Sequence, residues 1–368
     1  MKRCILIYSF LVLISVCSVR ASVDDKECGS NLNHLWLDVI FVVDNAANSE
    51  TNQVLDIVQS LFPPDVQIGT GYDDPRSTRI GVMYSGIEAT VETDWYKLQS
   101  YDDFNIEINR LKTIPNDNVD YQNMNNVLNK AVEMIEDTKG IRDNYKKLVV
   151  IFTHDYYKCP NCYSIADEMR ANGTTIATVN MYRAGLDPFL QTIASYGMNF
   201  NFTDPLLRQQ LRTALLSVNC HCPAPLTQYS VPTSIGSHPY AICVSSSFQK
   251  EYWHAAQLYC HQHGQYLATE FTTQKRKFNM KFMNQKQEVN AYFSGLFYNN
   301  GSWVWDQPTG RPFLPLDPSS GSVSSRSGCV ADVKYADGTV SWTPISCSSA
   351  FPFICETIAC DTEHYCDL

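Results

Sequence analysis

Residues 253–260 read Trp-His-Ala-Ala-Gln-Leu-Tyr-Cys, and residues 351–356 read Phe-Pro-Phe-Ile-Cys-Glu. The first segment has the apolar spacing of a helix that ends at its cysteine, and the second is a short apolar strand around another cysteine. Short strands are also predicted around 292–296 and 329–334. This order of helix, short strands and cysteines decides the fold of the C-terminal third of the chain.

The pattern resembles a C-type lectin-like domain of the long form, over about residues 222–356. Phe293-Ser-Gly-Leu296 is similar to that family's core Trp-Ile-Gly-Leu, and Trp303-Val-Trp305 matches its following strand. The resemblance implies an α+β domain with three disulfides. Cysteine arithmetic alone permits many other pairings. The three implied pairs are Cys222–Cys243, Cys260–Cys355 and Cys329–Cys347.

The family's calcium-binding residues are missing at one key position. The resemblance implies that calcium and sugar would be held by Glu-Pro-Asn or Gln-Pro-Asp in the long loop and by Trp-Asn-Asp in a later strand. Calcium needs roughly six to eight oxygen ligands. Here Trp342 is followed by Thr343-Pro344, so both oxygen-bearing side chains of the second motif are lost.

The long loop, residues 306–328, is rich in Pro, Ser and Gly and shows little periodicity. A structureless loop of that length inside a compact domain is often functional. Its Gln307-Pro308-Thr309 lacks the acid of Gln-Pro-Asp, and Asp317 is a single carboxylate. We therefore expect binding without calcium or any other cofactor. The candidate ligand-binding residues of this loop are Gln307, Phe313 and Asp317.

The first half of the chain alternates predicted strands and helices. Residues 37–43 and 148–152 are continuous apolar runs of strand length, as expected for strands buried on both faces. Such alternation favours a parallel sheet covered by helices on both sides. Further strands are predicted at 79–84 and 175–179, and helices at 49–61, 121–137, 165–171, 187–196 and 204–218.

This half resembles a von Willebrand factor type A domain, over about residues 36–218. The resemblance rests on the strand that ends Phe-Val-Val-Asp44 before a helix, and on Leu148-Val-Val-Ile-Phe-Thr153. It implies a Rossmann-like α/β fold. It also implies a divalent cation at the carboxyl edge of the sheet, where open α/β sheets bind ligands.

The cation-binding motif of that family, Asp-x-Ser-x-Ser, is poorly matched here. Ala46 stands at the first Ser and offers no oxygen, and His154 occupies the position of a later Asp. Because magnesium tolerates missing oxygen ligands badly, we expect a scaffold without metal. Asp44 then caps the following helix. The remaining weak metal candidates are Asp44, Asn48 and Asp155.

The N-terminus is typical of a signal peptide. Lys2 and Arg3 precede an apolar run from Cys4 to Val16, and residues 19–21 resemble a cleavage site. The run is too short for a comfortable membrane anchor. We expect cleavage of residues 1–21, no membrane span and a secreted, extracellular protein. Cleavage changes the formal net charge from −10 to −13, which argues against nucleic acid as a partner.

Cleavage also removes Cys4 and Cys17 and leaves 12 of the 14 cysteines. An even number in an oxidising compartment suggests six disulfides. With three pairs taken from the lectin resemblance, the remaining six cysteines are expected to pair as Cys28–Cys220, Cys159–Cys162 and Cys360–Cys366. Asn-x-Ser/Thr triplets, which fit a secreted glycoprotein, occur at Asn172, Asn201 and Asn300.

Catalysis is not expected. Cys159-Pro-Asn-Cys162 is a Cys-x-x-Cys motif, which is the pattern of thiol-disulfide exchange enzymes. No thioredoxin pattern surrounds it, and a local structural disulfide is favoured. A zinc site built from Cys159, Cys162, Cys220 and Cys222 has the right ligand number, but an oxidising compartment disfavours it. Neither a nucleophile motif nor a phosphate-binding glycine loop is found.

The predicted organisation is a signal peptide (1–21), a type A domain (28–219), a C-type lectin-like domain (220–358) and a tail (359–368). This architecture resembles secreted nematode C-type lectin-like proteins, which implies a link to innate immune defence. We expect a recognition protein that binds an extracellular protein or glycan through its lectin-like domain. The alternative is a matrix or adhesion protein that acts through the type A domain.

Overall fold

The computed structural model of the chain describes residues 24–367, except for 48, 87, 119–121, 155, 158–160, 183–186, 235 and 286. The predicted signal peptide therefore falls outside the described residues. The described chain forms two compact units, and both are discontinuous in sequence. Residues 26–244 and 358–367 form the α/β unit, and residues 24–25 and 245–357 form the lectin-like unit.

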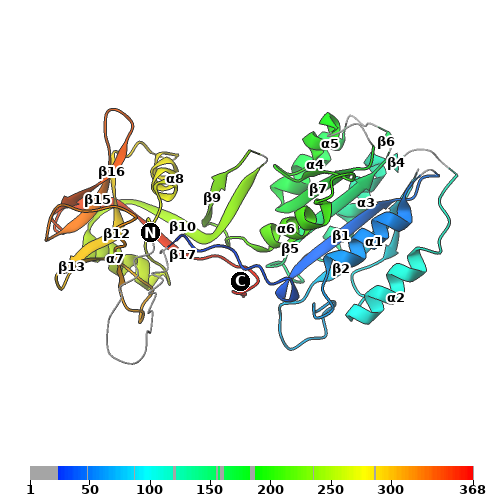
Figure 1. Ribbon diagram of the computed structural model, residues 1–368, viewed down its shortest axis with the longest axis horizontal. Helices are drawn as coiled ribbons and strands as arrows, with labels where there is room; N and C mark the ends of the chain where they lie inside the picture. The colour runs from blue at the N-terminus through cyan, green and yellow to red at the C-terminus, as the bar shows by residue number, and fades with distance from the viewer. Residues whose placement is uncertain are drawn as a thin grey trace, which may run out of the picture. The chain divides into compact units, whose positions relative to one another are not determined.

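The α/β unit is built around a six-stranded sheet in the order β3-β2-β1-β5-β7-β8 (Figure 1). All neighbouring strands run parallel except β3, which is antiparallel to β2. The central strands are apolar and buried, as expected for a sheet covered on both faces. The six strands are β1 (Leu37–Asp44), β2 (Arg79–Ser85), β3 (Ala89–Thr93), β5 (Lys146–Thr153), β7 (Thr174–Asn180) and β8 (Asn199–Asn201).

Helices cover both faces of this sheet, because successive side chains of a strand point to opposite sides. In β1, Phe41 packs in one core with α1 (Thr51–Leu61), α2 (Tyr101–Leu111) and α6 (Leu207–Asn219). The next residue, Val42, packs in the other core. The helices of that second core are α3 (Met124–Glu136), α4 (Cys162–Ala171) and α5 (Pro188–Ile193).

Short elements complete the α/β unit. A two-stranded sheet joins β4 (Gln122–Asn123) and β6 (Tyr156–Tyr157) in parallel. After α6, β9 (Thr227–Pro232) forms an antiparallel hairpin with the first part of β10 (Ser237–Tyr252). A single turn of 3₁₀ helix, η1 (Leu32–His34), precedes β1.

The last residues of the chain are part of the α/β unit. His221 and Cys360 exchange backbone hydrogen bonds of 2.9 Å. The fully buried Trp36 donates its indole N–H to the carbonyl of Asp361 at 2.8 Å. Its ring also lies 4.9 Å from that of Tyr365. Residues 359–368 were expected to form a separate tail, whereas the contacts group 358–367 with the sheet. The predicted domain boundaries themselves remain predictions.

The lectin-like unit combines two helices with short strands around β12 (Ala291–Asn299). Strand β12 pairs antiparallel with β13 (Ser302–Trp305) and β15 (Cys329–Lys334), and parallel with β17 (Ala350–Ile358). Helix α7 (Trp253–Gln262) buries Trp253 and Cys260 against this sheet. The remaining elements are β11 (Tyr266–Leu267), α8 (Thr273–Asn284), β14 (Leu314–Pro315) and β16 (Val340–Ile345).

The predicted fold class, an α/β type A domain followed by an α+β lectin-like domain, is confirmed. Predicted elements differ from the observed ones mainly at their ends: the helix expected from 121 begins at Met124, and the one expected from 165 begins at Cys162. Helix α2 was not predicted, and neither were several strands, among them β3, β8, β9, β10 and β16. The loop 306–328 is also less irregular than expected, because β14 pairs with β13 and Trp303 donates its indole N–H to the carbonyl of Ser325.

Candidate functional site

Asp44 ends β1 at the carboxyl edge of the sheet, where the type A resemblance places a cation. Its side chain is fully buried. One carboxylate oxygen accepts the backbone N–H of Ala46 at 2.9 Å, and the other accepts that of His154 at 2.8 Å. The hydroxyls of Ser49 and Thr51 donate to the carbonyl of Asp44. The carboxylate of Asp44 thus binds two backbone amides, and it does not cap α1 as expected, because the N-cap residue of that helix is Glu50.

These residues do not fit a magnesium site. Ala46 supplies no side-chain oxygen, and both carboxylate oxygens of Asp44 already accept backbone N–H groups. Asn48 and Asp155, the other two candidates, lie outside the described residues. Within the part of the chain that is described, there is no group of three or more His, Cys, Asp or Glu side chains placed to hold a metal ion.

The structure contains five disulfides between described cysteines. Three lie at the pairs implied by the lectin resemblance, Cys222–Cys243, Cys260–Cys355 and Cys329–Cys347. Two more join Cys28 to Cys220 and Cys360 to Cys366, as expected for the cysteines left over. Cys162 is also disulfide-bonded, and Cys159 lies outside the described residues. The disulfides have a structural role, because each one reduces the conformational entropy of the unfolded chain.

The loop 306–328 begins at a buried carboxylate. Asp306 is fully buried and accepts hydrogen bonds from the Gln257 amide at 2.6 Å and from the backbone N–H of Leu267 at 2.8 Å. His261 Nε2 lies 3.1 Å from the same carboxylate. Because these partners come from α7 and β11, the start of the loop is fixed to the body of the unit.

The three candidate residues of this loop each have local partners. Gln307 donates its amide to the carbonyl of Asp306 at 2.7 Å. Asp317 accepts the N–H and the hydroxyl of Ser319, both at 2.7 Å, in a tight turn. Phe313 is 41% exposed and meets the ring of Phe297 edge-on. Phe313 is therefore the apolar candidate that a ligand can reach.

A buried acidic cluster lies beneath Trp342, the residue of the degraded calcium motif. Glu270 accepts hydrogen bonds from the Tyr292 hydroxyl at 2.6 Å and from the Trp342 indole at 3.2 Å. Arg276 Nε lies 3.7 Å from Glu270 and 3.5 Å from Asp332. Its guanidinium also stacks 4.0 Å from the Trp342 ring. Burial and the neighbouring Glu270 raise the pKa of Asp332 well above its usual range.

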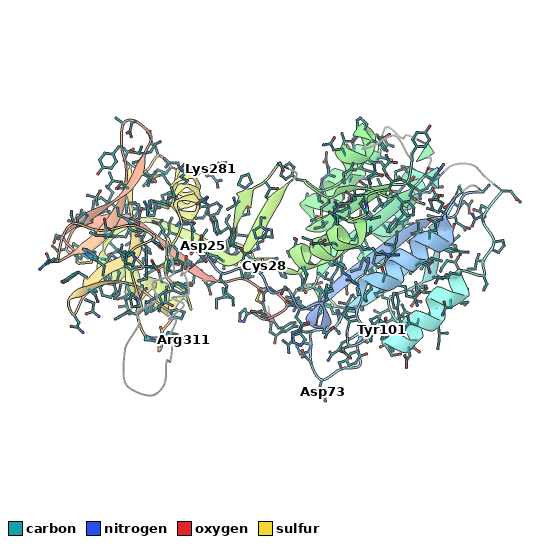
Figure 2. The ribbon with its side chains drawn as sticks, in the orientation of Figure 1. Asp25, Cys28, Asp73, Tyr101, Lys281 and Arg311 are labelled. Carbon is teal, nitrogen blue, oxygen red and sulfur yellow. A yellow bond between two sulfur atoms is a disulfide. The ribbon has the colours of Figure 1, made fainter. Side chains whose placement is uncertain are left out.

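A second buried cation sits one residue earlier on α8. Lys275 is fully buried, and its Nζ lies 2.7 Å from Glu356 and 3.2 Å from the Thr269 hydroxyl. Asp25, labelled in Figure 2, lies 3.9 Å from the same nitrogen. The buried Glu356 therefore has a cation of the same unit as its direct partner.

Sequence reasoning did not single out Lys275, Arg276, Glu270 or Asp332. The two bases lie in a polar helix with exposed lysines, such as Lys281, and neither base is distinguished from its neighbours by spacing or composition. The one sequence feature that pointed to this region was Trp342, because Thr343-Pro344 replace the two oxygen-bearing residues that follow it in the family's calcium motif.

The predicted glycosylation triplets lie at three different local structures. Asn300 is exposed, with a φ of 46°, at the turn between β12 and β13. Asn172 is exposed at the end of α4, but the threonine of its triplet, Thr174, is 5% exposed. Asn201 is half-buried, and its side-chain oxygen accepts two hydrogen bonds from Thr203.

Comparisons with known proteins match both halves. The model of the von Willebrand factor type A domain matches residues 38–214, and that of the C-type lectin domain matches residues 249–357. A relative from Caenorhabditis elegans, C-type lectin domain-containing protein 160, is 24% identical over 93% of this chain. The alignment covers 56% of that relative, so the chain spans little more than half of its length.

Solved structures of similar fold cover one unit each. Proximal thread matrix protein 1 from the mussel byssus, with a zinc-occupied MIDAS motif, is 16% identical at a TM-score of 0.42 and covers 52% of this chain and 48% of its own. The Ca²⁺-independent C-type lectin SPL-2 from Saxidomus purpuratus is 18% identical at a TM-score of 0.29 and covers 37% of this chain and 93% of its own. The two family matches identify this chain as a von Willebrand factor type A domain followed by a C-type lectin domain.

Proposed function

We propose that this chain is an extracellular recognition protein whose lectin domain binds a protein or glycan through the loop 306–328, without calcium. The observation that carries the proposal is the pair of bases on α8, of which Lys275 is fully buried and the Arg276 side chain is 12% exposed. Arg276 lies against Glu270 and Asp332, and Lys275 lies against Glu356. Glu270 and Asp332 are buried acids beside Trp342 of the degraded motif, and a divalent cation would have to compete with the guanidinium of Arg276 for them.

The loop itself supports recognition by shape and surface. Its start is fixed by Asp306, its apolar side chains Leu314 and Leu316 pack against the buried cluster of Leu296, Trp305 and Val330, and Phe313 stays exposed. A rigid loop that presents an aromatic side chain loses little conformational entropy on binding. The role of Asp44 in holding backbone amides gives no comparable support to metal-dependent adhesion through the type A domain.

Ligand binding is expected to be unchanged when divalent cations are removed. The full-length protein would be applied to a glycan array and used to capture extracellular proteins, in calcium and magnesium and then in excess EDTA. Phe313→Ala should weaken the bound signals, whereas Tyr252→Ala, a change at an exposed tyrosine of the same unit outside the loop, should not. Loss of all binding in EDTA would sink the proposal.

A second prediction concerns N-glycosylation of the secreted protein. Because Asn300 is exposed at a hairpin turn, it should carry an N-glycan when the chain passes through a secretory pathway. Mass spectrometry of peptides from secreted protein, before and after glycosidase treatment, measures this occupancy. The variant Asn300→Gln is the control. An unmodified Asn300 in secreted protein would contradict the expectation.

None of the described helices is long and apolar enough to cross a membrane.

A further inference from the structure

A groove of about 360 Å³ lies on the α/β unit, far from the degraded cation motif in sequence. Its walls come from helix α6, from the segment that leads into β8, and from the hairpin of β9 and β10. None of its fifteen lining residues is Asp, Glu, Lys or Arg. The only histidine of the lining, His238, lies 2.6 Å from the Glu27 carboxylate, and the other lining residues are uncharged. Most of the groove therefore offers no partner to a charged ligand.

Helix α6 presents a row of polar side chains to this groove. Gln209, Thr213 and Ser217 follow one another at intervals of four residues, so they lie on one stripe of the helix, one per turn. None of the three side chains makes a hydrogen bond to another described residue. Their amide and hydroxyl groups are therefore available as both donors and acceptors along the length of the groove.

An aromatic ring and a backbone contact define the rest of the groove. Tyr196 is 77% exposed, the highest value among the large apolar side chains of the described chain. The next residue, Gly197, meets Gly236 of the hairpin so closely that a Cβ on Gly236 would lie 3.0 Å from the Gly197 Cα. The hairpin thus packs by backbone against the rim that carries Tyr196.

We propose that this groove binds a neutral oligosaccharide. The exposed ring of Tyr196 offers an apolar face with a polar tip, which suits the C–H face of a sugar ring. The row of Gln209, Thr213 and Ser217 suits the hydroxyls that a saccharide presents on every unit. An extended neutral peptide fits less well, because its successive side chains point to opposite sides. This site is independent of the loop 306–328.

The test uses full-length protein freed of its own N-glycans, so that these do not fill the groove. Immobilised neutral oligosaccharides of hexose and N-acetylhexosamine units serve as probes, with neutral peptides as the alternative ligand. Tyr196→Ala and Thr213→Arg should each weaken saccharide binding by about tenfold or more. Thr213 is exposed and Arg favours helix, so the second variant should fold.

Two control variants separate this site from others. Tyr182→Ala removes a 58% exposed tyrosine of the same unit that does not line the groove, and Phe313→Ala alters the lectin loop. Both should leave binding in the groove unchanged. The proposal is overturned if no neutral saccharide binds, if both groove variants bind as the parent does, or if only neutral peptides show binding that Tyr196→Ala removes.

Discussion

Replacing Lys275 with methionine is expected to lower the free energy of unfolding of the lectin domain by about 3–5 kcal/mol. The substitution keeps the apolar length of the side chain but removes the ammonium that lies 2.7 Å from Glu356. Glu356 is 1% exposed, so its charge would stay buried with its cation gone. A buried charge without a partner costs far more than the pair itself contributes.

Chemical denaturation followed by pulsed hydrogen exchange and mass spectrometry measures this effect, with peptides from β12 and β15 as reporters of the lectin domain. Lys281→Met is the matched control, because Lys281 is an exposed lysine on the same helix (Figure 2). The double variant Lys275→Met with Glu356→Gln should recover part of the loss, since it removes the stranded charge. Equal stability of Lys275→Met and Lys281→Met would contradict the role given to the buried ammonium.

Ending the chain at residue 357 is expected to destabilise the type A domain rather than the lectin domain, by about 3 kcal/mol or more. The truncation uncovers Trp36, which is fully buried and whose indole N–H loses the carbonyl of Asp361. It also leaves the backbone N–H of Gly29 without the Asp361 carboxylate that accepts it at 2.8 Å. Both losses fall at the end of the sheet where β1 begins.

The same exchange measurement, read in peptides from β1 and β5, gives the stability of the type A domain. A chain that ends after Cys366 is the matched control, because it keeps Tyr365 and the Cys360–Cys366 bridge. If the truncated chain does not fold, Tyr365→Ala is the substitute variant. It should lower the stability of the type A domain by a smaller amount, measured in the same peptides. A truncation that weakened only β12 and β15 would show that residues 358–367 belong with the lectin domain.

The sequence was sufficient for the fold where patterns were long and strong. The apolar run of β1 and the cysteine order of the lectin domain predicted both architectures, and the five observed bridges lie at expected pairs. The sequence of helix α2 contains an N-cap residue and a helical apolar spacing, but the helix was not predicted from them. Ser100 caps its N-terminus, and Phe104, Ile108 and Leu111 form its buried face. Its high proportion of polar and acidic residues hid that spacing.

The candidate sites were harder to predict, because they depend on which partner a side chain meets. The loss of oxygens at Thr343-Pro344 was visible in the sequence, but the cations that take over the buried acids were not. Lys275 and Arg276 are residue types of a solvated helix face, and only tertiary packing buries Lys275 and leaves the Arg276 side chain 12% exposed. The groove beside α6 was likewise invisible, since it depends on a hairpin that returns to the helix after a turn.

The return of residues 358–367 to the type A domain has a consequence for how the protein is made. Synthesis runs from the N-terminus, and domains generally fold as they emerge. The strands of the type A sheet are complete by residue 201, yet the residues that cover Trp36 are translated only after the entire lectin domain. The end of the first domain around Trp36 therefore stays uncovered until the second domain has been synthesised.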